Sequence, residues 1–257
     1  MPNPKRNKAK ETMTICGAHI VKQVILRRPD AIRIAYFDSR KKHTEKMISL
    51  AQEAYSQGVP IEWVSIEKLE KFSSQRRHQG VVLLCDARPW WSEADVDELL
   101  KQSAYPFIMV LDGVQDPHNL GAILRSSHMM GVDMVIAPKH GACGLSETVH
   151  QVSCGASVLT PYIQVTNLAR VLQNMAKKGI WITALDAKAD MPLADIDFKG
   201  PVALVMGSEG SGARRLSLKN CDFYAHIPMV GCLDSLNVSV AAGMAMYEVQ
   251  RQRTGLK

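Results

Sequence analysis

Apolar and polar positions follow two patterns along the chain, and the first covers about residues 14–88. Here short apolar segments typical of strands alternate with amphipathic segments typical of helices. Strands are predicted at 32–39, 59–65 and 80–87, and helices at 15–26, 43–58 and 66–72. This alternation predicts a small α/β sandwich as the first domain.

The second pattern begins at Phe107, where the strands become apolar throughout. Strands are predicted at 107–114, 132–137, 180–186, 201–207 and 224–229, and helices at 119–131, 146–156, 166–179, 213–221 and near the C-terminus. Continuously apolar strands between helices indicate a parallel sheet that is covered on both faces. Ligands of such sheets bind beyond the carboxyl ends of the strands, so we expect functional residues directly after strands.

A segment of different composition joins the two patterns. It contains Pro89, the pair Trp90–Trp91, an acidic helical stretch and Pro106. We interpret it as a linker, in which the tryptophans either make a contact between domains or stack on bases. The predicted organisation is a basic tail at 1–12, a first domain at 13–88, the linker at 89–105 and a second domain at 106–257.

Composition narrows the class of protein. Of the 257 residues, 46% are hydrophobic and 22% are charged, as in folded globular proteins. The formal charge of +6 mildly favours a polyanionic partner. The six cysteines form no Cys-x-x-Cys pair and the eight histidines show no ligand spacing, so we expect reduced cysteines and no metal. Without a transmembrane run or a signal core, the expected location is the cytoplasm.

The first polar loop after a strand reads DGVQDPHNLGAILR, from Asp112 to Arg125. Asn119 is expected to cap the helix that follows, and Gly121 permits a close backbone approach. Arg125 lies on this helix beside apolar neighbours. A capped helix with one exposed arginine is the structural alternative to a binding loop.

The second loop is rich in glycine and follows a strand that ends at Gly207. It contains neither the Gly-Lys-Ser/Thr of a P-loop nor the Gly-x-Gly-x-x-Gly of dinucleotide-binding proteins, which disfavours a nucleotide-dependent oxidoreductase. Glu209 would repel a phosphate. The loop therefore suits a neutral or cationic ligand, or one that is bound by backbone groups.

The third loop leads from a strand end to the last helix, IPMVGCLDSLNVS at 227–239. One of its polar residues, Ser235, Asn237 or Ser239, is expected to cap the helix. The small residues that begin the helix allow close packing or a dimer contact. Capping needs only one polar residue, so the others point to a ligand.

The three loops together resemble the motifs of the SpoU, or TrmH, family of ribose 2′-O-methyltransferases in the SPOUT superfamily. The motifs read Asn119-x-Gly121-x-x-x-Arg125, LVMGSEG at 204–210, and IPM at 227–229 with SLNVS at 235–239. The resemblance covers about residues 107–253. It implies an α/β SPOUT fold with a parallel sheet and a deep C-terminal trefoil knot, a homodimer, and S-adenosylmethionine as the cofactor.

The same resemblance implies the residues of the site. The implied catalytic residues are Asn119, Arg125, Glu209, Ser235 and Asn237. The implied cofactor-binding residues are Met206, Gly207, Gly210, Ile227, Pro228, Met229 and Leu236. Arg125 is the residue that the motif marks for activating the ribose hydroxyl. A guanidinium has a pKa above about 12, so we expect it to stabilise the alkoxide or hold a phosphate rather than act as a base.

The first domain resembles the small α/β ribosomal-protein-like (L30e/L7Ae-like) RNA-binding domain of the family's ribosomal RNA enzymes. Gly17-Ala18-His19 and His78-Gln79-Gly80-Val81 carry this resemblance. The basic groups at 27–28, 40–42 and 76–78 are expected to contact phosphates, whereas 214–215 either steer RNA or lie on the surface. The expected substrate is a guanosine ribose in 23S ribosomal RNA. Methylation of transfer RNA and a non-catalytic role in ribosome assembly are the alternatives.

Overall fold

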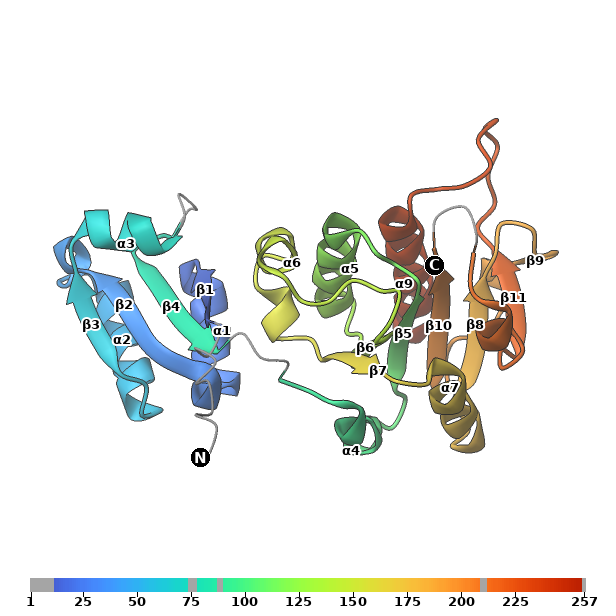
Figure 1. Cartoon of the computed structure of the whole chain (residues 1–257), viewed down its shortest axis with the longest axis horizontal. Coiled ribbons are helices and arrows are strands. Elements are labelled where there is room, and N and C mark those ends of the chain that lie inside the picture. The colour runs from blue at the N-terminus through green and yellow to red at the C-terminus, as the bar shows by residue number, and fades with distance from the viewer. Residues whose placement is uncertain (1–11, 74–77, 87–89, 209–211, 256–257) are drawn as a thin grey trace, which may run out of the picture. The chain divides into compact units, whose positions relative to one another are not determined.

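A computed structural model of the chain describes residues 12–73, 78–86, 90–208 and 212–255 (Figure 1). The chain divides into two units between Trp90 and Trp91. The Trp90 indole donates to the carbonyl of Asp86 at 3.2 Å and lies 4.8 Å from the Arg28 guanidinium. Trp91 packs against the apolar core of the second unit. Each tryptophan is therefore anchored in its own unit.

The first unit is a four-stranded sheet with three helices. In chain order, its elements are β1 (Thr12–Cys16), α1 (Ala18–Arg27), β2 (Ile32–Asp38), α2 (Glu45–Ser56), β3 (Ile61–Val64), α3 (Ile66–Ser73) and β4 (Val81–Asp86). The strand order is β1-β4-β2-β3, with β4 antiparallel to both of its neighbours and β3 parallel to β2. The alternation of strands and helices in the sequence thus forms an α/β unit.

The start of this unit differs from the expectation of a helix over 15–26. Residues 12–16 form β1, which pairs with β4 from Thr12 opposite Asp86 to Cys16 opposite Val82. Its burial alternates, with Met13 and Ile15 inside. Gly17, at a φ of +103°, turns the chain into α1. The run was too short for this period of two to stand out against the helix that follows it.

The second unit is a seven-stranded sheet with helices on both faces. Its elements are α4 (Val96–Lys101), β5 (Phe107–Asp112), α5 (Pro117–Met129), β6 (Met134–Pro138), α6 (Glu147–Val152), β7 (Tyr162–Val165), α7 (Leu168–Lys177), β8 (Trp181–Leu185), β9 (Met191–Pro192), β10 (Val202–Gly207), α8 (Arg215–Leu218), β11 (Phe223–His226) and α9 (Val238–Thr254). The strand order is β7-β6-β5-β10-β8-β11-β9, and all of these pairs are parallel. The expected α/β fold with a parallel sheet is confirmed.

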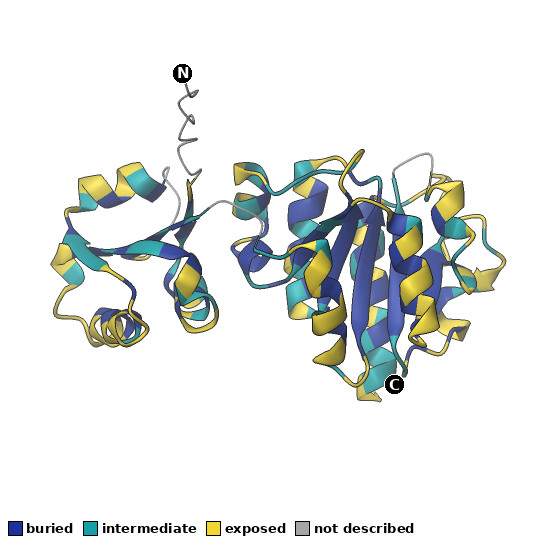
Figure 2. Ribbon diagram, turned by 60° about the horizontal axis from the view of Figure 1, so that its bottom comes forward, coloured by how far each residue is buried: buried dark blue, intermediate teal, exposed yellow. Residues whose placement is uncertain are grey.

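Two apolar layers cover the faces of this sheet. Along β5, Phe107, Met109 and Leu111 join the layer of α5, α6 and α9, whereas Ile108 and Val110 join the layer of α4 and α7. The central strand β5 is buried along its whole length and β10 is buried up to Met206, as Figure 2 shows. Burial on both faces explains why these strands read as continuous apolar runs.

The segment before β10 holds the last helix in place. The Gln252 carboxamide accepts from Phe198 N–H at 2.9 Å and donates to the Ile196 carbonyl at 2.9 Å. The Arg253 guanidinium donates to the carbonyl of Gly200 at 2.7 Å. These bonds fix the C-terminal turns of α9 to residues far from it in the sequence. No helix in the described part of the chain is long and apolar enough to span a membrane.

Candidate functional site

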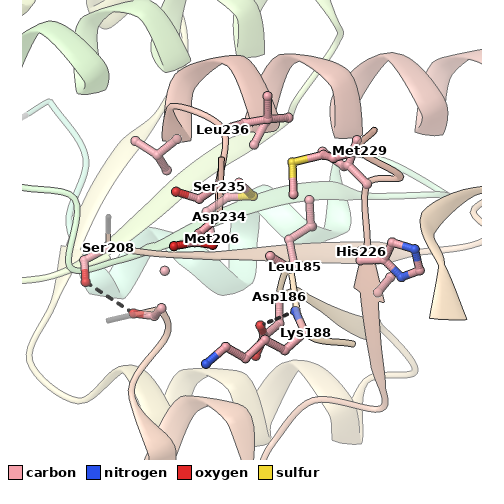
Figure 3. A pocket seen from close by; sticks show the side chains of 17 residues that line it. Leu185, Asp186, Lys188, Met206, Ser208, His226, Met229, Asp234, Ser235 and Leu236 are labelled. Atoms are coloured by element: carbon pink, nitrogen blue, oxygen red, sulfur yellow. Dashed lines mark hydrogen bonds between the residues drawn. The ribbon is translucent and has the colours of Figure 1, made fainter. Parts of the chain in front are cut away.

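A pocket of about 780 Å³ opens at the carboxyl ends of β8, β10 and β11 (Figure 3). Met206 and Gly207 line it from the end of β10, and Ile227, Met229 and Leu236 line it from the loop between β11 and α9. Parallel α/β sheets bind ligands at this edge. The second and third loops therefore meet at one cavity.

The loop after β10 folds back tightly on itself. Ser208 and Gly212 exchange backbone hydrogen bonds of 3.0 and 3.1 Å, and the Ser208 hydroxyl lies 3.3 Å from the Gly212 carbonyl. A Cβ on Gly207 would overlap the backbone of Gly212 and Ala213. Gly207 is therefore glycine because two stretches of backbone touch at this wall of the pocket.

The chemistry of the pocket suits an organic cation. Leu185, Met206 and Leu236 give it apolar walls, while Asp186 and Asp234 add two carboxylates. Lys188 also lines the pocket, and its backbone N–H donates to the Asp186 carboxylate at 2.9 Å (Figure 3). S-adenosylmethionine combines an apolar body with a sulfonium and an ammonium group, so the residues present fit it.

Asn119 and Asn237 connect the first and third loops. The Asn237 Nδ2 donates to the Asn119 Oδ1 at 3.0 Å, and Asn119 is buried. Asn237 caps α9 as one of the expected polar residues, because its Oδ1 accepts from the Ser239 and Val240 N–H groups. The expectation that Asn119 is a cap is wrong, since Asp116 caps α5 and leaves Asn119 in the first turn.

Arg125 lies on the exposed face of α5, outside the lining of the pocket. Its Nη1 is 3.5 Å from the Sγ of Cys154. This contact depends on Gly121, because a Cβ there would collide with Val152 and crowd the N–H of Ser153. The end of α6 can therefore approach α5 closely and bring Cys154 to the arginine.

The remaining site predictions fall at different places. Ser235 lines the pocket, whereas Pro228 is not among its lining residues. Glu209 and Gly210 lie outside the described residues. The pocket thus brings together the cofactor-binding residues of two motifs, and the roles of all these residues stay predictions.

The pocket residues at the end of β8 and directly after it were not predicted from the sequence. Leu185, Asp186, Ala187 and Lys188 line the pocket at the carboxyl end of this strand. The rule that ligands bind beyond strand ends applies to β8 as it does to β10. The end of the apolar run at Leu185, followed by an aspartate, was the signal that could have indicated them.

Cysteines near the site differ in exposure. Burial and the neighbouring Asp116 raise the pKa of the Cys143 thiol. The backbone carbonyl of Cys143 accepts a hydrogen bond from the Tyr162 hydroxyl. Cys154, beside Arg125, is exposed. In the described part of the chain, no group of three or more histidine, cysteine or acidic residues could hold a metal ion.

Comparison with known proteins decides the family. A protein-family model described as the SpoU rRNA Methylase family matches residues 106–247. The chain belongs to the SpoU family. A second model, described as RNA 2′-O ribose methyltransferase substrate binding, matches residues 14–91. The membership expected from the three motifs is confirmed, and with it an enzyme that uses S-adenosylmethionine.

Curated SpoU relatives match nearly the whole chain. The 23S rRNA (guanosine-2′-O-)-methyltransferase RlmB of Coxiella burnetii is 42% identical over 241 residues, which cover 93% of this chain and 96% of that protein. The protein of the same name from Shewanella oneidensis is 41% identical over 239 residues, covering 93% and 97%. The similarity therefore extends over both units.

A solved SpoU structure has the same fold. The methyltransferase AviRb from Streptomyces viridochromogenes, in complex with AdoMet, aligns with a TM-score of 0.76 at 21% identity. The alignment covers 99% of this chain and 95% of that one. At this identity the likeness bears on the fold alone.

Proposed function

We propose that this chain transfers a methyl group from S-adenosylmethionine to the ribose 2′-hydroxyl of a guanosine in 23S ribosomal RNA. The substrate is the one named for the Coxiella and Shewanella relatives. One observation carries the proposal. The loop that lines the pocket through Ile227 and Leu236 also supplies Asn237, which bonds Asn119 of the first motif. Cofactor and ribose would thus meet at one loop.

The cofactor side of the reaction depends on the walls of the pocket. When bound, S-adenosylmethionine supplies an electrophilic methyl group on a positively charged sulfur. Met206, Gly207 and Leu236 would hold it by apolar contact and backbone atoms, and Asp186 would offset its positive charge. Gly210 and Pro228 are proposed as further cofactor contacts by motif alone.

The ribose side depends on orientation. The bond between Asn119 and Asn237 fixes both carboxamides, and Ser235 lies on the adjoining loop. We assign these three residues to holding the ribose in line with the methyl group. Alignment of two reactants can lower a barrier by up to about 7–11 kcal/mol.

Arg125 is proposed to stabilise the alkoxide that forms on the ribose, or to hold the adjacent phosphate. A guanidinium group in a protein keeps its proton and has no acceptor, so this side chain cannot take the hydroxyl proton as a base. Glu209 is proposed to pair with it and fix its orientation. A positive charge aimed at a developing oxyanion is a common source of rate acceleration.

The first unit, with boundaries at 13–88, is proposed to be the ribosomal-protein-like RNA-binding domain. The proposed linker spans 89–105 and the proposed methyltransferase domain spans 106–257. The two sequence signatures of the first unit lie together, because Ala18 N–H donates to the Gln79 side chain at 3.0 Å. The Lys41 ammonium reaches the Gln79 carbonyl at 3.3 Å, so a basic loop adjoins them. Arg76 and Arg77 lie outside the described residues. A cytoplasmic location accords with an RNA substrate.

A deep trefoil knot in the second unit is also proposed. After β8 the chain passes through β9 and the segment 193–200 before it enters β10. The helix α9 contacts α5 and residues 193–195 of this segment. Gln252 and Arg253 of α9 are hydrogen-bonded to Phe198 and Gly200 in the same segment. Threading of α9 beneath the segment would produce this arrangement. Pulling single molecules by both ends should give a contour length shortened by the knot, and a fully extended chain would contradict it.

A homodimer is proposed from the exposed face of α9. Val240, Met244 and Tyr247 are 51%, 45% and 54% exposed, and their spacing puts them on one side of the helix. A second copy of the chain would cover this apolar stripe. Light scattering should give twice the chain mass, and Met244→Glu should shift it toward the monomer.

The function is tested with labelled S-adenosylmethionine and unmodified 23S ribosomal RNA or transfer RNA. After digestion, 2′-O-methylguanosine from 23S RNA is expected. Label in transfer RNA alone would keep the chemistry and refute the substrate. Cofactor binding without label in any RNA would favour a role in ribosome assembly.

A further inference from the structure

A buried carboxylate that the proposed methyl transfer does not use lies at the end of β5. The side chain of Asp112 has no exposed surface. Its Oδ2 accepts a hydrogen bond of 2.8 Å from the backbone N–H of Arg214, and its Oδ1 lies 3.5 Å from the Nε of the same arginine. Because a buried carboxylate needs a partner, Arg214 is the residue that stabilises it there.

Arg214 follows directly after the loop that lines the cofactor pocket. Ser208 and Gly212 line the pocket and bond each other, and Arg214 comes two residues later. Its bond to Asp112 attaches the end of this loop to β5. Since β5 leads into the loop of Asn119, the carboxylate links the cofactor side of the site to the ribose side.

The arginine side chain also reaches the loop after β6. Its Nη2 donates to the carbonyl of His140 at 3.4 Å. The same nitrogen occupies the space that a Cβ on Gly141 would need, and Gly141 has a φ of +77°. The guanidinium is thus held where the loops after β5, β6 and β10 meet.

Part of this guanidinium faces outward. The side chain of Arg214 is 53% exposed although it contacts a fully buried carboxylate. Asp112 contacts Nε and the His140 carbonyl accepts from Nη2, whereas no acceptor among the described residues contacts Nη1. Guanidinium groups recognise phosphate oxygens with paired N–H donors. A ribose within RNA has a phosphate on each side, and Arg125 would hold at most one of them.

We propose that Arg214 binds a phosphate of the substrate RNA next to the methylated ribose, and that Asp112 is a positioning residue that holds Arg214 and the cofactor loop. This inference rests on the proposed function, because it takes RNA as the substrate. The next residue, Arg215, begins α8 with an exposed side chain. It carries the same charge and serves as the matched control.

The experiment compares Arg214→Ala with Arg215→Ala in the full chain. Binding of an unmodified 23S RNA transcript is measured over a range of salt concentrations. Loss of one phosphate contact should weaken binding by about ten-fold and reduce the slope of log affinity against log salt by about 0.7–0.9. Arg215→Ala should change affinity by less than about two-fold. Equal changes in both variants would show a general charge effect and overturn the proposal.

Calorimetry with S-adenosylmethionine alone separates the two residues. Asp112→Asn should weaken cofactor binding by about three- to ten-fold, because it makes the bond to the loop a neutral one and removes the ion pair with Arg214, and RNA binding should fall with it. Unchanged binding of both would refute the positioning role. If Arg214→Ala weakens cofactor binding and keeps the salt slope, the arginine only supports the loop.

Two controls keep these results interpretable. Arg214→Lys keeps the charge and should retain most of the salt slope, which shows that the chain with a changed residue 214 still folds. The unsubstituted chain is assayed for methyl transfer in parallel. If it methylates no RNA, the proposed function fails, whereas the difference between the two arginine variants in RNA binding still decides the role of Arg214.

Discussion

The two sides of the site are built in different ways. On the proposed cofactor side, the wall at Gly207 is formed by backbone, and the reciprocal bonds between Ser208 and Gly212 close the loop after it. On the proposed ribose side, the contacts are made by single side chains: Asn237 donates to Asn119, and Arg125, exposed on α5, contacts Cys154. One wall of the proposed cofactor side therefore depends on backbone packing, whereas the proposed ribose side depends on where a few side chains point.

This difference predicts how the two sides respond to change. A wall formed by backbone is little affected by changes of most side chains, but an added Cβ disrupts it where two backbone segments touch. A site made of side chains loses its function by truncation, with little effect on the pocket next to it. Mutations on one side should therefore separate cofactor affinity from turnover.

The largest effect is expected from Arg125→Ala. If the guanidinium stabilises the alkoxide, its removal should lower kcat by about 100- to 1000-fold, as for the loss of an oxyanion donor. Cofactor affinity should stay unchanged, because Arg125 lies outside the pocket. Single-turnover methyl transfer and calorimetry check the two statements. A normal turnover with a stable fold would remove Arg125 from the mechanism.

Gly207→Ala should lower the affinity for the cofactor, which Arg125→Ala leaves unchanged. The added Cβ would overlap the backbone of Gly212 and Ala213, so the loop must move at a cost of about 1–3 kcal/mol. We expect cofactor affinity to fall by about 5- to 150-fold at that cost. Gly200→Ala is the control, since a Cβ there meets no atom within 4 Å. Equal affinities for both variants would contradict the wall formed by backbone.

A smaller effect is expected from the pair Asn119 and Asn237. Each alanine variant should slow turnover, and the double variant should cost less than the sum, because both remove the same 3.0 Å hydrogen bond. The expected coupling in a double-mutant cycle is about 0.5–1.5 kcal/mol. Additive losses would show that the two carboxamides act independently.

The smallest effect concerns the thiols, and it depends on pH. Burial raises the pKa of Cys221 to about 12, so its reactive thiolate stays scarce until the pH approaches that value. At a pH well below that value, the exposed thiol of Cys154 should be alkylated while Cys221 stays unmodified. Mass spectrometry after timed alkylation measures both. Modification of Cys154 should slow turnover a few-fold through Arg125, and bound cofactor should not prevent it.

Much of this site follows from strand ends that are visible in the sequence. The loops after β5, β10 and β11 carried recognisable residue patterns, and two of them do line the pocket. Residues 185–188 were missed because β8 ends in ordinary residues without such a pattern. The contact of Arg125 with Cys154 could not be predicted, since it joins positions 29 residues apart and depends on the close packing at Gly121.

The anchoring of the last helix has a consequence for synthesis. The ribosome adds Gln252 and Arg253 of α9 after every strand of the sheet that this helix covers. Until they emerge, the carbonyls of Ile196 and Gly200 lack the donors that α9 provides, and one face of the sheet lacks the part of its cover that α9 supplies. A nascent chain stalled before α9 therefore has the three strands that end at the pocket but no finished pocket, and should bind cofactor only after α9 has emerged.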